Sequence, residues 1–77
     1  MFKKGEIVKS KNRTEGHELF LLVLYDPSPS PIQFNAVVIK DLVNEEENGL
    51  IANNWNTEQF VISDIKDLSK AVYKNGN

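Results

Sequence analysis

His17 is the side chain of this 77-residue sequence best suited to acid–base chemistry, because it is the only histidine and stands beside Glu18. A carboxylate next to an imidazole can orient a general base that works near neutral pH. No serine or aspartate completes a nucleophilic constellation around this pair, and a histidine at the start of a strand after a glycine loop is usually an exposed surface residue. A small enzyme that uses His17 is therefore the most distant function considered, and the sequence predicts no catalytic residue.

Metal and cofactor chemistry also lacks its usual ligands. One histidine and no cysteine cannot supply a tetrahedral zinc set, and the acidic residues do not follow the spacing of a calcium loop. The sequence contains no glycine-rich loop of the kind that cradles phosphates. It therefore predicts neither a metal site nor a cofactor.

Trp55 and an acidic run at 45–47 are the features from which a binding surface could be built. Carboxylates attract a basic partner and speed its encounter, and an aromatic ring is an anchor that interfaces favour. The alternative is that the acidic run is a solvated turn and that Trp55, with Phe60 five positions later, belongs to the core. The predicted protein-binding surface consists of Glu45, Glu46, Glu47 and Trp55.

Charge is distributed unevenly along the chain, although the net charge is only −2. Residues 1–13 contain five basic side chains against Glu6, a balance of +4, whereas residues 41–58 contain five acidic side chains and no basic one, a balance of −5. The basic segment, with Phe2 as a stacking residue, could bind nucleic acid. The acidic half and a sequence pI of about 5.3 count against that alternative.

Short apolar segments between turn signals predict a β-rich fold. The expected strands are 2–9, 17–25, 32–42, 50–53 and 60–62, and the expected helix is 65–73. Three prolines make 26–31 a stiff connecting loop that would lie beside the binding surface, and Asn48-Gly49 indicates a tight turn. A helical turn capped by Asn56 or Thr57 should precede the last strand, and Ser63 should cap the helix.

The small core is predicted from the inward positions of these strands. Its expected members are Leu21, Val23, Phe34, Val38, Trp55 and Phe60. The three asparagines around Trp55 suggest a ring at the rim of the core, half exposed, with its N–H bonded to a backbone carbonyl.

Three segments of the chain resemble small SH3-like barrel proteins of bacteria and phages. These are Lys4-Gly5-Glu6-Ile7-Val8-Lys9, Phe34-x-Ala36-Val37-Val38-Ile39 and Asn54-Trp55-x-x-x-x-Phe60. The resemblance covers about residues 2–62 and implies a fold whose members bind peptides, nucleic acids or other subunits. The proline loop and the helical tail lie outside the pattern, and the Tyr and Trp cluster of peptide-binding SH3 domains is not evident.

Together these features predict one all-β domain over 1–77, an SH3-like barrel of about five antiparallel strands at 2–62 with a short C-terminal helix in the tail at 63–75. The expected function is that of a non-enzymatic binding or accessory module that engages a protein partner; the alternative is a nucleic-acid-associated barrel. No run reaches the roughly 18 apolar residues of a membrane span, and no signal-peptide region follows the N-terminus. We therefore expect a cytoplasmic protein.

Overall fold

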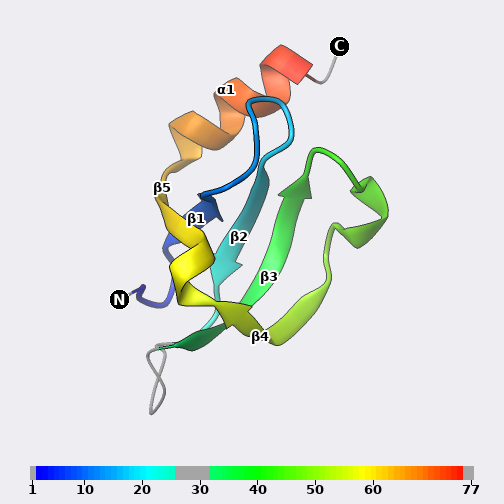
Figure 1. Ribbon diagram of the computed structural model, residues 1–77. Coiled ribbons are helices and arrows are strands. Elements are labelled where there is room, and N and C mark those ends of the chain that lie inside the picture. The colour runs from blue at the N-terminus through cyan, green and yellow to red at the C-terminus, as the bar shows by residue number, and fades with distance from the viewer. Residues whose placement is uncertain (1, 26–31, 76–77) are drawn as a thin grey trace.

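The predicted strands and C-terminal helix are all present in the computed structural model, which describes residues 2–25 and 32–75 (Figure 1). In chain order the elements are β1 (Ile7–Ser10), β2 (Leu19–Val23), β3 (Gln33–Asp41), η1 (Glu45–Glu47), β4 (Ile51–Asn56), η2 (Thr57–Gln59), β5 (Phe60–Ser63) and α1 (Ile65–Asn75), where η marks a 3-10 helix. The predicted proline loop at 26–31 lies outside the described residues. Strand β4 runs further than expected, so Trp55 lies on it.

The five strands form one antiparallel sheet in the order β4-β3-β2-β1-β5. Both edge strands are fully described and do not pair with each other, so the expectation of a closed barrel is wrong: the sheet is open. The reason is η2, which spans the gap between the edges. Thr57 N–H donates to the Ile32 carbonyl at 2.8 Å on the β3 side, and Lys11 N–H donates to the Gln59 carbonyl at 2.9 Å on the β1 side.

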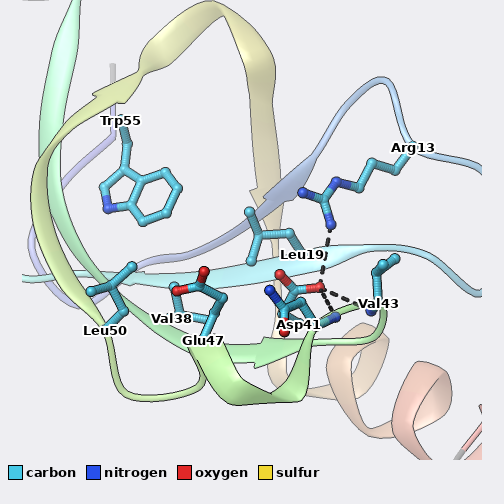
Figure 2. A pocket seen from close by; sticks show the side chains of 9 residues that line it. Arg13, Leu19, Val38, Asp41, Val43, Glu47, Leu50 and Trp55 are labelled. Atoms are coloured by element: carbon cyan, nitrogen blue, oxygen red, sulfur yellow. Dashed lines mark hydrogen bonds and ion pairs between the residues drawn. The ribbon is translucent and has the colours of Figure 1, made fainter.

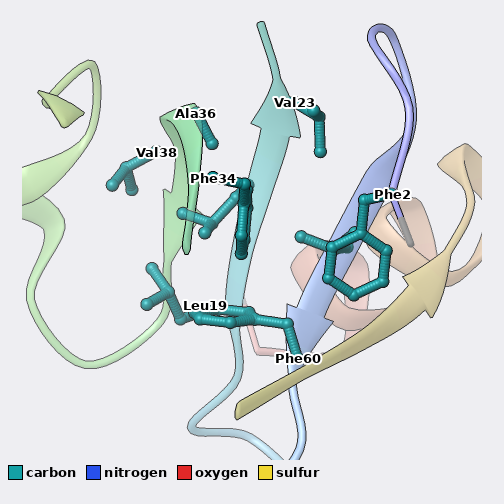
Figure 3. Packing of buried hydrophobic residues seen from close by; sticks show 9 residues of the cluster. Phe2, Leu19, Val23, Phe34, Ala36, Val38 and Phe60 are labelled. Atoms are coloured by element: carbon teal, nitrogen blue, oxygen red, sulfur yellow. The ribbon is translucent and has the colours of Figure 1, made fainter. Parts of the chain in front are cut away.

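One face of the curled sheet, the inner face, holds the hydrophobic core (Figure 3). The buried cluster consists of Phe2, Val8, Leu19, Leu21, Val23, Phe34, Ala36, Val38 and Phe60, with Trp55 packed against it half-buried. Five of the six predicted core residues are thus buried, and Trp55 is at the rim. Phe2 is only 7% exposed and its ring meets that of Phe34 edge-on, with centroids 5.3 Å apart. It is therefore a core residue and is not available to stack on a nucleic-acid base.

Helix α1 belongs to the outer face. Strand alternation places Phe20 there, and both Phe20 and Ala71 of the helix are buried. An ion pair of 2.7 Å between Lys9 Nζ and Asp67 Oδ2 ties β1 to the first turn of α1. Asp64, rather than the predicted Ser63, caps the helix, because its Oδ1 accepts from the Asp67 N–H at 2.8 Å.

Candidate functional site

A groove lies at the open end of the inner face, where β2 begins and β3 ends (Figure 2). We call it the Trp55 groove; its volume is about 390 Å³. Its lining consists of Arg13, Leu19, Val38, Asp41, Val43, Asn44, Glu47, Leu50 and Trp55. Ligand cavities begin at about 300 Å³, so the groove is of a size to take a small ligand or a few side chains of a partner.

Trp55 forms one wall of the Trp55 groove and is fixed from two directions. Its indole N–H donates to the Ala36 carbonyl at 3.2 Å, which agrees with the backbone bond expected for this ring. Its ring meets that of Phe60 edge-on, with centroids 6.0 Å apart and an interplanar angle of 87°. Because the ring is already held in place, a ligand that packs against it would lose little side-chain entropy on the protein side.

A bulge in β3 turns Asp41 toward the groove. Val38 pairs with Leu21, but Asp41 pairs with Leu19, so β3 has one residue more than β2 between these two pairs. The extra residue reverses the alternation of side chains, and Asp41 falls on the inner face beside Val38. In an unbulged strand Asp41 would have pointed outward.

Asp41 is only 5% exposed, and one of its oxygens organises the surrounding backbone. Oδ1 accepts the backbone N–H of Val43 at 2.9 Å and that of Asn44 at 3.0 Å. The Asp41 N–H in turn donates to Asn48 Oδ1 at 2.8 Å. These bonds hold the connection between β3 and β4 close to the sheet, and that connection carries η1.

Arg13 lies across the groove from Trp55, on the connection between β1 and β2 (Figure 2). Its Nη1 donates to Asp41 Oδ1 at 3.3 Å and to the His17 carbonyl at 3.4 Å. The Arg13 side chain remains 38% exposed, whereas that of Asp41 is 7% exposed. The buried carboxylate thus positions a guanidinium at the mouth of the groove.

The three predicted glutamates form η1 and have different surroundings. Glu45 forms an ion pair with Lys40, and the hydrogen bond from Lys40, followed by its positive charge, lowers the pKa of the Glu45 carboxyl. Glu46 is exposed and does not line the groove. Glu47 is half-buried, lines the groove and has no hydrogen bond or ion pair from its carboxylate within the described residues. Of the predicted surface, the groove therefore brings together Glu47 and Trp55.

His17 does not form with its neighbour Glu18 the hydrogen-bonded pair that a catalytic role would need. The imidazole Nδ1 lies 2.9 Å from Thr14 Oγ1, and the Glu18 carboxylate accepts from the Gly16 N–H at 2.8 Å. His17 is exposed and lies outside the lining of the Trp55 groove.

Across residues 2–25 and 32–75, no three histidine, aspartate or glutamate side chains are grouped so that they could hold a metal ion. Within those ranges no helix is long and apolar enough to span a bilayer.

The basic N-terminal segment is divided between different parts of the molecule. Lys9 is engaged by Asp67 against helix α1, whereas Arg13 is engaged by Asp41 at the groove. Lys11 Nζ lies 3.4 Å from the Glu58 carbonyl. Several cations facing one phosphate backbone are what nucleic-acid affinity requires, and these side chains are spread over separate surroundings instead.

Sequence reasoning missed two charged residues of the groove, Asp41 and Arg13. An aspartate followed by Leu-Val-Asn at the end of an apolar strand is a signal for a turn in which the carboxylate accepts nearby backbone N–H groups. That signal could have identified Asp41. Arg13 carries no such local signal, because its partner is 28 positions away.

Comparisons with known proteins give no relative from which a function could be transferred: no protein-family model, curated protein or solved structure matches this chain.

Proposed function

We propose that this protein is a non-enzymatic binding module, and that it holds a segment of a protein partner in the Trp55 groove. The observation that carries the proposal is that one groove opening from the core places a fixed aromatic wall, Trp55, beside a carboxylate with no partner in the described part of the chain, Glu47. Aromatic anchors in preformed hollows contribute most of the affinity of many interfaces.

The lining indicates what kind of segment would fit. Leu19 and Val38 are buried, and Leu50 is 45% exposed, so the groove offers apolar surface to an apolar side chain. Glu47, with Glu46 next to it, would attract a basic residue on the partner. The proposed partner segment therefore combines an apolar residue with a basic one.

The architecture supports the same function without determining it. An open, curled five-stranded sheet with aromatic residues on its inner face is compatible with the SH3-like resemblance, which remains a proposal. SH3-like folds serve as binding modules for several classes of partner, so the proposed ligand class rests on the groove and not on the fold.

The proposal can be tested with peptides, because the protein has a single tryptophan and hence one indole N–H resonance. Peptides selected from a random display library would be titrated into ¹⁵N-labelled protein. We expect the strongest binders to contain a basic residue and an apolar one, and to shift the Trp55 indole signal and the Glu47 amide.

Charge reversal supplies a matched pair of variants. Glu47→Lys should abolish or strongly weaken binding of these peptides, whereas Glu58→Lys, the same change at an exposed residue outside the lining, should not. Selected peptides that perturb a different surface, or that bind both variants like the wild type, would rule out the Trp55 groove as the binding site.

A further inference from the structure

A second hollow adjoins the Trp55 groove. It has a volume of about 290 Å³ and is lined by Ser10, Asn12, Arg13, Leu19, Trp55, Gln59 and Phe60. Three of these residues, Arg13, Leu19 and Trp55, also line the Trp55 groove. A bound segment long enough to fill both hollows would pass these three side chains.

The two hollows differ in the charge of their linings. In the Trp55 groove, Asp41 and Arg13 offset each other and leave the negative charge of Glu47. In the second hollow, Arg13 is the only charged residue among the described residues of the lining. The combined site therefore presents the Glu47 carboxylate in the Trp55 groove and the Arg13 guanidinium where the two hollows join.

Arg13 has hydrogen-bonding capacity left for a ligand. Its contacts to Asp41 and to the His17 carbonyl both use Nη1. Within residues 2–25 and 32–75, Nη2 and Nε have no protein partner, and these two groups can donate in parallel to a carboxylate. Asp41 also restricts where the guanidinium lies, so less side-chain freedom is lost when the second anion binds.

From this geometry we infer that the partner segment is bipolar: a basic residue lies toward Glu47, an apolar residue packs against Trp55 and Leu19, and a carboxylate side chain is held by Arg13. The inference rests on the proposed function and deepens it, because it assigns the polarity and the acidic component of the ligand. A single positioned guanidinium suits a singly charged carboxylate, so we assign an aspartate or glutamate and not a phosphorylated residue.

The test is a double-mutant cycle that combines a change of Arg13 in the protein with a change of the acidic side chain in the peptide. A selected peptide that carries both charges is compared with a version in which its acidic residue is replaced by the amide. A hydrogen-bonded pair with a partly exposed guanidinium should contribute a factor of about 5–30 in affinity. We expect the amide peptide to bind wild-type protein more weakly by that factor.

Variants of the protein complete the cycle. Arg13→Gln should weaken binding of the acidic peptide by about the same factor of 5–30 while leaving the amide peptide unchanged. Lys11→Gln removes the same charge from a residue outside both linings and should change neither peptide by more than about twofold. Should Arg13→Gln fail to fold, the comparison of the two peptides on wild-type protein still decides the matter.

Other results have distinct meanings. If both peptides bind wild-type protein equally, or if Arg13→Gln weakens both equally, Arg13 does not hold a carboxylate and the inference fails. In either case the proposed function stands as long as the peptides shift the Trp55 indole signal. A phosphoserine peptide that binds far better than the glutamate peptide would overturn the assignment of a carboxylate. If no peptide shifts the Trp55 signal, the proposed function fails together with the inference.

Discussion

Replacing Asp41 by alanine should lower the stability of this protein by far more than its single charge suggests. Oδ1 accepts two backbone N–H groups and one guanidinium N–H. A hydrogen bond to a charged group contributes about 1.5–3 kcal/mol when it is shielded from water. Val43 and Asn44 are exposed, so water replaces part of what their N–H groups lose, and we expect a total cost of about 2–4 kcal/mol.

Urea and thermal unfolding measure this cost directly. For a domain of this size the melting temperature should fall by about 10–25 °C, with the urea m-value unchanged. Two further variants separate the contributions. Arg13→Gln removes only the half-exposed partner and should cost about 1 kcal/mol or less. Asp41→Asn keeps an oxygen acceptor for the two backbone groups and should fall between the other two.

If Asp41→Ala melts within a few degrees of wild type, the carboxylate does not hold the connection between β3 and β4. If Arg13→Gln is as destabilising as Asp41→Ala, the ion pair and not the backbone bonds carries the energy.

Three other outcomes follow from the same structure. Phe34→Ala should cost about 3–5 kcal/mol in urea unfolding, because Phe34 is buried in the core, and a variant that melts like wild type would contradict this placement. His17→Ala should stay within about 0.5 kcal/mol of wild type in the same assay, since the side chain is exposed. The hydrogen bond from Lys9, together with one from Ser63, lowers the pKa of the Asp67 carboxyl in the folded protein. The ionised carboxylate therefore stabilises the fold fully above its unfolded-state pKa near 3.9. That stabilisation is lost as the pH falls through the lower folded-state pKa. Asp67→Asn should therefore be less stable than wild type by about 0.3–1 kcal/mol at pH 7, a small cost because water screens the partly exposed ion pair. In unfolding curves recorded at successively lower pH below about 4, this difference should disappear.

The β-rich fold could be predicted because each strand carries its own signals. Apolar segments bounded by polar turns located all five strands, and the alternation in β3 put Phe34 and Val38 inward, as found. The cap of η2 was also predictable, because its two residues are only two positions apart in the sequence. Asn56 Oδ1 accepts from the Glu58 N–H at 2.9 Å. Local signals therefore gave the elements and the main part of the core.

The remaining features depend on interactions that local patterns do not encode. The bulge in β3 appears only when the strand is paired with β2, and it decides that Asp41 faces inward. Sheet closure likewise depends on how η2 meets both edges of the sheet, and the short polar segment gave no sign of that. For the candidate site, the sequence singled out Glu47 and Trp55, but the carboxylate–guanidinium pair opposite them required the tertiary structure.

The pairings of the sheet close loops of very different length. Leu21 meets Val38 after 17 positions, whereas Val8 meets Ile62 after 54. The longer loop costs about 1 kcal/mol more in chain entropy, so we expect β1 and β5 to pair late in folding. Trp55 and Phe60 lie on the two edge strands, and the late pairing brings Phe60 opposite Ser10 of β1, which lines the second hollow together with both rings. A ligand held beside both rings would then recognise only the fully assembled sheet, and its binding would also make that sheet harder to unfold.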